Sequence, residues 1–343
     1  MSVTALLTHT TQHRSRYLLS LLLLLLSVLT GSVFELAIGP RFIPPSTVLQ
    51  ALLHYDPMNF SHHVVIELRL LRLVAALMVG AALGVAGLLL QSVIRNPLGE
   101  PHILGLNAGA SLAVVACTAF GVNWVTTPLL RPLAAAGGAA LVFSLVIAFS
   151  SAGRSGMTVI KVTLCGVALS AFTASLTATI LILDEQTLLD MRTWLAGDLS
   201  GLRWPVVSAA ALPLLLAGIL ALWLAPALNA MALGDHQARG LGVNITRTRG
   251  LAVLTIALLS GVAASLAGPI GFVGLIVPNI VRRLVTRDLQ RSIPCCALAG
   301  GLILLVADIA ARTLVAPQEL ATGVMTALAG APVFIFIASR LFK

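Results

Sequence analysis

The chain has 343 residues, of which 58% are hydrophobic and only 10% are charged, and its mean hydropathy is +1.02. A soluble domain usually carries about 25% charged residues, so this composition excludes a soluble globular protein and predicts a helical protein that crosses a membrane many times. The net charge of +9 is dispersed over short connections rather than clustered, which excludes a nucleic-acid-binding surface and reports membrane orientation instead.

Hydrophobic segments long enough to span a membrane follow one another along the whole chain. At about 20 residues per span, one bundle of about ten helices uses nearly all residues, so we treat 1–343 as a single transmembrane domain. The first segment resembles a signal peptide, but it is long for one and lacks a small-residue cleavage site, so we expect an uncleaved span. The predicted spans are 17–38, 64–92, 103–120, 129–151, 160–183, 204–225, 249–267, 270–285, 292–312 and 320–340.

The distribution of basic residues predicts which loops face the cytoplasm. With the N-terminus inside, only seven of the 21 Lys and Arg residues fall on the outer side. These seven are Arg41, Arg69, Arg72, Arg131, Arg192, Arg203 and Arg312. The excess inside agrees with the positive-inside rule, so we expect both termini of this multi-pass protein in the cytoplasm.

Two connections are long enough to have structure of their own. The outer segment 184–203 is polar and contains Trp194, which is typical of an interfacial helix at the level of the lipid headgroups. The inner loop 226–249 contains Gly234, Gly240 and Gly242, which divide it into short helices. Ordering such a loop costs conformational entropy, so we expect it to dock against another protein.

Small residues recur where helices are expected to touch. The spacings Gly80-x-x-x-Gly84 and Gly105-x-x-x-Gly109 let two helix backbones approach closely. The fifth span also carries a stripe of small and hydroxyl residues at steps of three and four, which places them on one helix face. The stripe consists of Thr163, Gly166, Ser170, Thr173 and Thr177. It is either a packing face with hydroxyls bonded to backbone carbonyls or the wall of a transport path.

Charged residues lie within or beside two spans, although a charge near the membrane centre costs roughly 2.5–3.5 kcal/mol. Arg69 and Arg72 share a helix face at the outer start of the second span. They either reach toward the lipid headgroups or present positive charge to an acidic partner. Asp308 and Arg312 have i,i+4 spacing near the outer end of the ninth span. This spacing predicts either a local ion pair or a further cation for the same partner.

Motifs of known catalytic and metal sites are missing from the sequence. It has no Gly-x-x-x-x-Gly-Lys-Ser/Thr loop for a nucleotide, no His-Glu-x-x-His pair for zinc and no Gly-x-Ser-x-Gly nucleophile. The four cysteines lack metal-ligand or disulfide spacing, and no acid lies clearly at mid-span. We therefore expect no catalytic residue, metal site or cofactor in this chain, and predict a transporter or scaffold without its own energy source.

The chain resembles the permease subunits of binding-protein-dependent ABC importers for iron-siderophores, haem and cobalamin, which are called the FecCD type. Eight segments match the family's motifs in order, and together they extend along nearly the whole chain. They are Leu68–Leu73, Val79–Gly84 with Gln91, Arg95–Gly105, Trp194–Gly197, Ala232–Val243, Gly268–Arg283, Leu305–Arg312 and Glu319–Pro332. Three positions depart from the family pattern: Leu71 and Ala321 replace prolines, and Asn279 replaces a histidine.

The resemblance implies a type II ABC importer permease fold with ten spans in a bacterial inner membrane. It also implies a second permease subunit, which is either another copy or a homologue, around a central path. Two cytoplasmic ATPases would bind the ATP and Mg²⁺, and a periplasmic or lipid-anchored solute-binding protein would deliver the cargo. Ferric siderophore is the expected cargo because most family members carry it, while haem and cobalamin remain open.

The resemblance also implies roles for individual residues in an alternating-access cycle. Three arginines, Arg69, Arg72 and Arg312, are expected to face acidic residues of the binding protein, and the stripe from Thr163 to Thr177 is expected to line the path. ATPase coupling is expected from Ala232, Leu233, Gly234, Asp235, Ala238, Arg239, Leu241 and Gly242. The alternatives are a secondary transporter driven by an ion gradient and an inactive assembly scaffold.

Overall fold

The computed structural model describes residues 3–39, 41–122, 130–152 and 158–341. Within these ranges the chain is helical and has no strand, which confirms the predicted all-α class. Residue 129 of the fourth predicted span, and Arg154 and Lys343 of the inner charge count, lie outside the described residues. The elements are α1 (Val3–Ala37), α2 (Pro45–Leu53), α3 (Phe60–His63), the π-helical stretch η1 (Val64–Arg69), α4 (Leu70–Ile94), α5 (Leu106–Ala119), α6 (Leu130–Ser151), α7 (Val159–Leu183), α8 (Glu185–Leu195), α9 (Trp204–Met231), α10 (Asp235–Gly240), α11 (Ile245–Ala267), α12 (Val273–Leu284), α13 (Leu289–Thr313) and α14 (Thr322–Leu341).

Seven helical segments in the described ranges are long and apolar enough to cross a membrane. They are Tyr17–Ala37, Phe60–Ile94, Leu130–Ser151, Ile160–Leu183, Trp204–Met231, Ile245–Ala267 and Leu289–Thr313. The three remaining predicted spans contain α5, α12 and α14. Each predicted span therefore holds one helix, as expected for a bundle of about ten.

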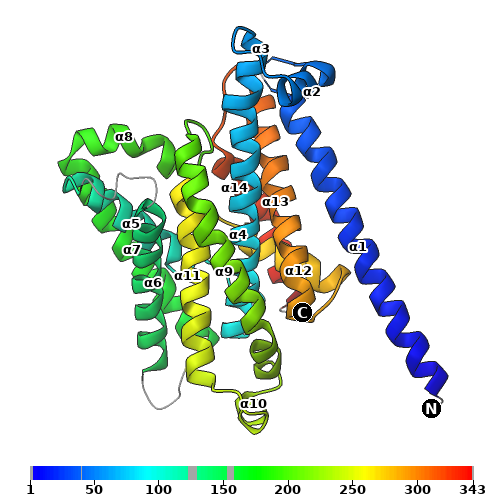
Figure 1. Ribbon diagram of the computed structural model, residues 1–343. Helices are drawn as coiled ribbons and strands as arrows, with labels where there is room; N and C mark the ends of the chain where they lie inside the picture. The colour runs from blue at the N-terminus through cyan, green and yellow to red at the C-terminus, as the bar shows by residue number, and fades with distance from the viewer. Residues whose placement is uncertain (1–2, 40, 123–129, 153–157, 342–343) are drawn as a thin grey trace.

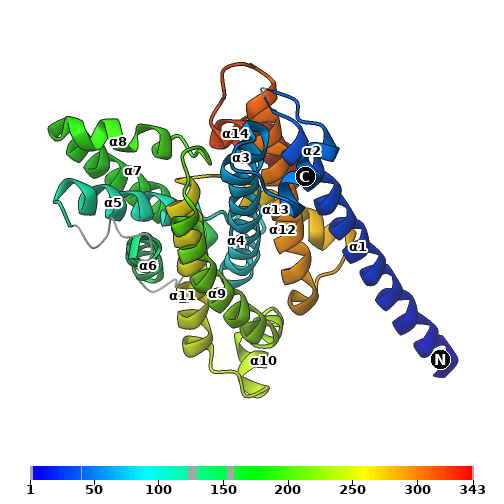
Figure 2. The ribbon, with the colours of Figure 1, turned by 45° about the horizontal axis from the view of Figure 1, so that its top comes forward.

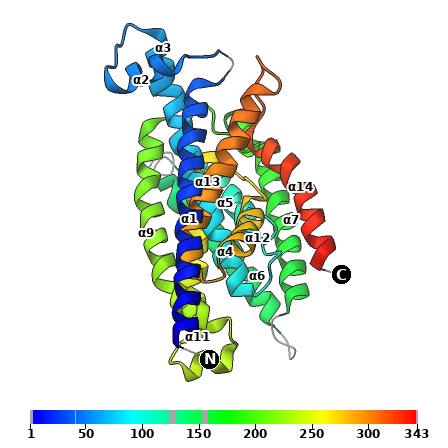
Figure 3. The same cartoon turned by 90° about the vertical axis from the view of Figure 1, so that its right-hand side faces the viewer.

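Helix α4 lies at the centre of the bundle, where it packs against α9, α11, α12 and α13 (Figure 1). A second group, formed by α5, α6 and α7, joins this centre through the contact of α6 with α11. Helix α1 packs on α13 at the edge of the bundle, as the side view also shows (Figure 3), and a row of its leucines is exposed. Such an apolar outer surface suits contact with lipid chains.

The two ends of the bundle carry different elements. Helices α2, α3 and α8 lie at one end, and α10 lies at the other together with the N-terminus (Figures 1 and 2). The predicted outer segment 184–203 and the predicted inner loop 226–249 therefore lie at opposite ends. Trp194 of the outer segment is buried under the Arg131 guanidinium, 5.1 Å from the ring centre, and the interfacial position of this segment stays a prediction.

Glycines form the closest helix contacts around α4. A Cβ atom on Gly80 would lie 2.2 Å from the carbonyl oxygen of Gly300 on α13, and one on Gly87 would lie 1.9 Å from that of Gly274 on α12. No side chain fits at such distances, so backbone touches backbone. The close approach predicted at Gly80-x-x-x-Gly84 is confirmed, and Gly109 approaches Gly138 on α6 in the same way.

Two predicted spans are shorter helices than expected. The prediction of a helix over 103–120 and another over 270–285 was wrong in extent, because α5 has 14 residues and α12 has 12. At 1.5 Å per residue these helices measure about 21 and 18 Å, well short of the roughly 30 Å hydrocarbon core. The missing length is mainly non-helical chain at 103–105 and 270–272, which apolar composition alone could not reveal.

The inner loop is shorter than predicted because its neighbouring helices extend into it. Helix α9 continues through Pro226 to Met231, and α11 begins at Ile245 rather than at 249. The prolines at 213 and 226 both lie inside α9. The loop proper is therefore 232–244, with α10 at its centre.

Candidate functional site

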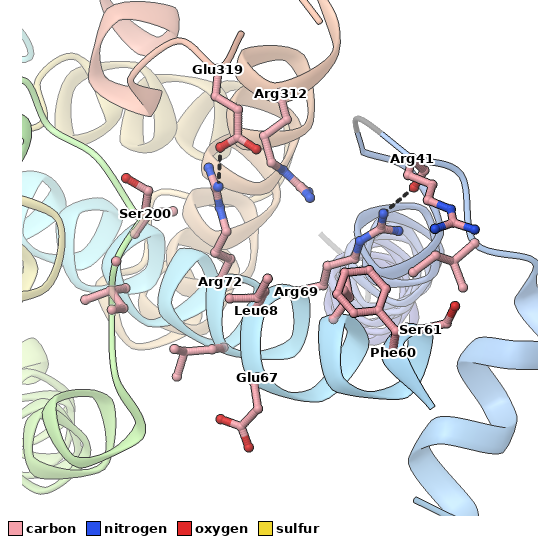
Figure 4. Close-up of a pocket in the computed structure, with 16 residues that line it drawn as sticks. Arg41, Phe60, Ser61, Glu67, Leu68, Arg69, Arg72, Ser200, Arg312 and Glu319 are labelled. Carbon is pink, nitrogen blue, oxygen red and sulfur yellow. Dashed lines mark hydrogen bonds and ion pairs between the residues drawn. The ribbon is translucent and has the colours of Figure 1, made fainter. Parts of the chain in front are cut away.

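Polar and charged side chains gather at three levels along the bundle. At the end that holds the predicted outer segment 184–203, which we call the outer end, arginines line a cavity of about 380 Å³ between η1, α4, the 199–202 segment and the α13–α14 connection (Figure 4). Within the bundle, the segments 95–105 and 268–272 meet in what we call the joint. At the inner end, α10 holds a cluster of ion pairs.

Arg72 is shared between two carboxylates at the outer end. Its Nε and Nη2 donate to Asp308 at 3.2 and 3.0 Å, and its Nη1 donates to Glu319 at 2.6 Å. Asp308 is fully buried and also accepts a hydrogen bond of 2.7 Å from Thr322. The bidentate geometry makes Asp308 a fixed counterion for Arg72.

Arg312 lies next to Arg72 and is 2% exposed. Its Nε forms an ion pair of 3.1 Å with Asp308, which confirms the pair predicted from the i,i+4 spacing. Its Nη2 donates to Glu35, a fully buried carboxylate on α1 that sequence reasoning missed. The only signal for Glu35 was its place as a single acid at the end of an apolar run.

Arg69 is buried without an acidic partner in the described part of the chain. Its Nη1 donates to the Leu36 carbonyl at 2.7 Å, and its Nη2 donates to the carbonyl of Arg41. Arg69 therefore holds the end of α1 and the chain that follows it against η1. The Arg41 side chain is exposed and lines the same cavity.

The carboxylates of the outer network are paired with two of its arginines. Arg72 and Arg312 face Glu35, Asp308 and Glu319, whereas Arg69 is held by backbone carbonyls. Buried charges require such pairing because desolvation costs several kcal/mol per ion. The predicted docking role of the three arginines stays a prediction, and in this structure their guanidinium groups are engaged within the chain.

The joint solves a hydrogen-bonding problem created by Pro278. Proline has no N–H, so the carbonyl of Gly274, four residues earlier, loses its helical donor. Gln91 of α4 replaces it, donating to Gly274 and also to Gly99, each at 3.3 Å. Helix α12 therefore runs through Pro278 to Leu284.

Three further side chains satisfy backbone groups of the joint. Glu100 accepts from the N–H of Phe272 at 2.9 Å and of Ile103 at 3.2 Å, and it is buried. Asn107 donates to the Ile270 carbonyl and Asn279 to the Pro97 carbonyl, each at 2.9 Å. Irregular backbone inside a membrane bundle needs such partners. The 268–272 segment thus enters the bundle and bonds to α5 and to the 95–105 segment.

The stripe on α7 faces its neighbours within the chain. Gly166 packs on Ile103 and Leu104, and Ser170 donates to the Ile103 carbonyl at 3.4 Å. Thr173 and Thr177 are buried and donate to carbonyls one turn earlier, whereas Thr163 is exposed. These contacts agree with the interpretation of the stripe as a helix-packing face. Whether the stripe also lines a path stays a prediction.

Asp235 ties the inner loop to two helices. Arg95, at the end of α4, donates to Asp235 and, at 2.7 Å, to the Met231 carbonyl. Arg249 of α11 donates to both Asp235 oxygens at 3.2 and 3.0 Å. Burial raises the pKa of Asp235, but the hydrogen bonds and charges of Arg95 and Arg249 outweigh it and hold that pKa below its usual range. The carboxylate therefore remains ionised at neutral pH.

The other residues predicted for coupling surround α10. Ala238 is buried against the bundle, while Leu233 and Leu241 are 64% and 65% exposed at the tip. Ala232 and Arg239 are also exposed. Gly234 and Gly242 have φ of +118° and +82°, values that favour glycine and let the chain turn before and after α10.

The chain is similar to known permeases over nearly its whole length. A model of the FecCD transport family matches residues 22–340. The ferric enterobactin transport system permease protein FepD of Escherichia coli (strain K12) is 40% identical over 319 residues, covering 92% of this chain and 94% of that protein. The vitamin B12 import system permease protein BtuC of Serratia proteamaculans (strain 568) is 37% identical, covering 98% and 96%.

A solved structure supports the same relationship. An inward-facing metal-chelate type ABC transporter has a TM-score of 0.76 and 28% identity to this chain, covering 94% of this chain and 99% of that one. This similarity confirms the ABC importer permease fold that the sequence motifs implied. The chain therefore belongs to the FecCD transport family.

Proposed function

We propose that this chain is the membrane permease subunit of an ATP-driven importer and that its cargo is a ferric siderophore. The observation that carries the proposal is the 40% identity to a ferric enterobactin permease over nearly the whole of both chains. The relative named for vitamin B12 import has almost the same identity, so cobalamin is the second candidate. Haem remains a third possibility that the family resemblance leaves open.

The proposed partners follow from what the chain lacks and what it exposes. The sequence has no nucleotide-binding loop, so two separate ATPase subunits would hold ATP and Mg²⁺. Large apolar side chains are exposed on α7 and α14, among them Leu164, Phe172, Leu328 and Phe336. These faces suit lipid or a second permease subunit, either a copy or a homologue. We place the protein in the bacterial inner membrane with both termini cytoplasmic.

The proposed cycle uses the two ends of the bundle for different partners. A loaded solute-binding protein docks at the outer cavity, where the arginines steer its acidic side chains. An ATPase docks at the inner loop, where the exposed Leu233 and Leu241 offer apolar contact. ATP turnover then moves the loop, and the joint and the α7 stripe open to one side at a time. The chain supplies the transport path and the loop that transmits the movement, and the ATPases supply the energy.

Reconstitution of the complete transporter with a panel of cargoes tests the proposal. Proteoliposomes with the ATPases and the binding protein should take up a ferric siderophore only when ATP is present. The panel comprises ferric catecholates, ferric hydroxamates, ferric citrate, haem and cobalamin. Uptake of cobalamin or haem alone would overturn the siderophore assignment and leave the importer assignment standing.

A further inference from the structure

The two acids on Arg72 are held very differently. Asp308 has no exposed surface, and it is bonded to Arg72, Arg312 and Thr322 at once. Glu319 lies in the connection between α13 and α14, its side chain is 36% exposed, and within the described residues its ion pair is with Arg72. One carboxylate is therefore built into the bundle, and the other lies at the mouth of the outer cavity.

Arg72 has one edge left for a carboxylate once Asp308 is in place. Asp308 takes the edge formed by Nε and Nη2, and Glu319 takes Nη1 at 2.6 Å. Figure 4 shows Glu319 pointing toward the Arg72 guanidinium. An acidic side chain that enters the cavity from outside would therefore compete with Glu319 for the remaining edge of Arg72, which Nη1 and Nη2 form.

Apart from Glu319, the lining of the cavity suits an acidic side chain that enters from outside. Its lining includes four arginines, Arg41, Arg69, Arg72 and Arg312, against two carboxylates, Glu67 and Glu319. Of these arginines, Arg41 has an exposed side chain, so it can meet an anion at the entrance. The remaining lining is largely apolar, including Phe60, Leu68 and Leu202, which strengthens a charge pair by excluding water.

We propose that Glu319 is an exchangeable internal occupant of the Arg72 site, which an acidic side chain of the solute-binding protein displaces when it docks. The inference rests on the proposed function, because it requires a binding protein at the outer cavity. Glu319 then lowers the docking affinity. It neutralises Arg72 between docking events, and docking must break the ion pair between Glu319 and Arg72. A partly exposed ion pair contributes about 0.2–1 kcal/mol, which corresponds to a factor of about 1.4 to 5 in affinity.

Glu67 provides a matched control for this proposal. It lines the same cavity and is exposed, it forms no ion pair within the described residues, and it points away from Arg72 in Figure 4. The variants Glu319→Gln and Glu67→Gln remove one negative charge each from the same surface. Their long-range effects on an acidic partner are therefore alike, and the difference between them isolates the contact with Arg72.

The experiment measures docking of the system's own solute-binding protein, purified without cargo, to the complete transporter in lipid nanodiscs. Glu319→Gln should lower the Kd by a factor of about 1.4 to 5 more than Glu67→Gln does. Equal effects of the two variants, or weaker docking by Glu319→Gln, would overturn the proposal. If the wild-type transporter does not bind the protein at all, the proposed function fails instead, so the two failures are distinguishable.

Discussion

Arg312 is the residue on which the buried outer network depends most. It lies between Glu35 and Asp308, two carboxylates with no exposed surface, and joins α1 to α13. Removing one partner from a buried ion pair leaves an uncompensated charge, which costs more than the pair itself contributes. The network is therefore expected to tolerate loss of its central cation poorly.

Arg312→Ala should destabilise the protein by about 3–5 kcal/mol, because both acids lose their shared cation. The measurement is the thermal unfolding midpoint of the purified protein in detergent. Arg203→Ala is the control, since Arg203 is an exposed outer arginine. Equal midpoints for the two variants would show that the network does not hold α1 to the bundle.

Sequence reasoning identified half of this network. The spacing of Asp308 and Arg312 on one helix predicts their pairing, because i and i+4 side chains are neighbours. Glu35 pairs with Arg312 across 277 residues, and Glu319 pairs with Arg72 across 247. No periodicity within one helix contains that information. It arises only when α1, α4 and α13 pack together.

At the scale of elements, the crossing of α4 and α13 depends on the absence of a side chain. Gly80→Ala should prevent normal packing, because the added Cβ would lie 2.2 Å from a backbone oxygen of α13. Gly218→Ala on α9 should be tolerated, because nothing lies within 4 Å of a Cβ there. The yield of monodisperse protein after detergent extraction compares the two. Normal yield of Gly80→Ala would contradict the described crossing.

The Asp235 cluster is the attachment of the inner loop to the bundle. Arg95 ends α4 with a left-handed φ of 53° and begins the joint, so its ion pair connects the loop to the joint directly. A loop that drives the cycle must transmit its motion through such contacts.

Asp235→Asn should therefore leave the ATPase bound while the cargo imported per ATP hydrolysed falls severalfold, as expected for about 0.5–2 kcal/mol of coupling. Asp288→Asn is the matched control, because it removes the same charge from another turn at that end. Unchanged coupling in Asp235→Asn, with full uptake, would remove the cluster from the mechanism.

Hydropathy located a helix in each predicted span, but it did not show where the backbone stops being helical. Residues 103–105 and 270–272 lie within predicted spans, yet they are irregular chain. Backbone groups of the joint are satisfied by Gln91 and Asn107, which lie on neighbouring helices, and by Glu100, which reaches from one segment of the joint to the other. Residue 226, where the inner loop was predicted to begin, is a proline that lies inside α9, so proline did not mark the end of this helix.

At the scale of the whole molecule, the three polar levels form a connected series. The outer network, the joint and the inner cluster all attach to α4, through Arg72, Gln91 and Arg95 in turn. Helix α4 is thus the element that joins the three levels. Within this chain the sequence offers no nucleotide-binding motif to power such a movement.

The central claim is that this chain is a conduit powered by ATP turnover in separate subunits. The most direct measurement compares uptake of a radiolabelled ferric siderophore by proteoliposomes that contain the purified chain alone, under an imposed ion gradient, with uptake by the complete transporter. We predict ATP-dependent accumulation by the complete transporter and none by the chain alone. Accumulation by the chain alone against a cargo gradient would contradict the account.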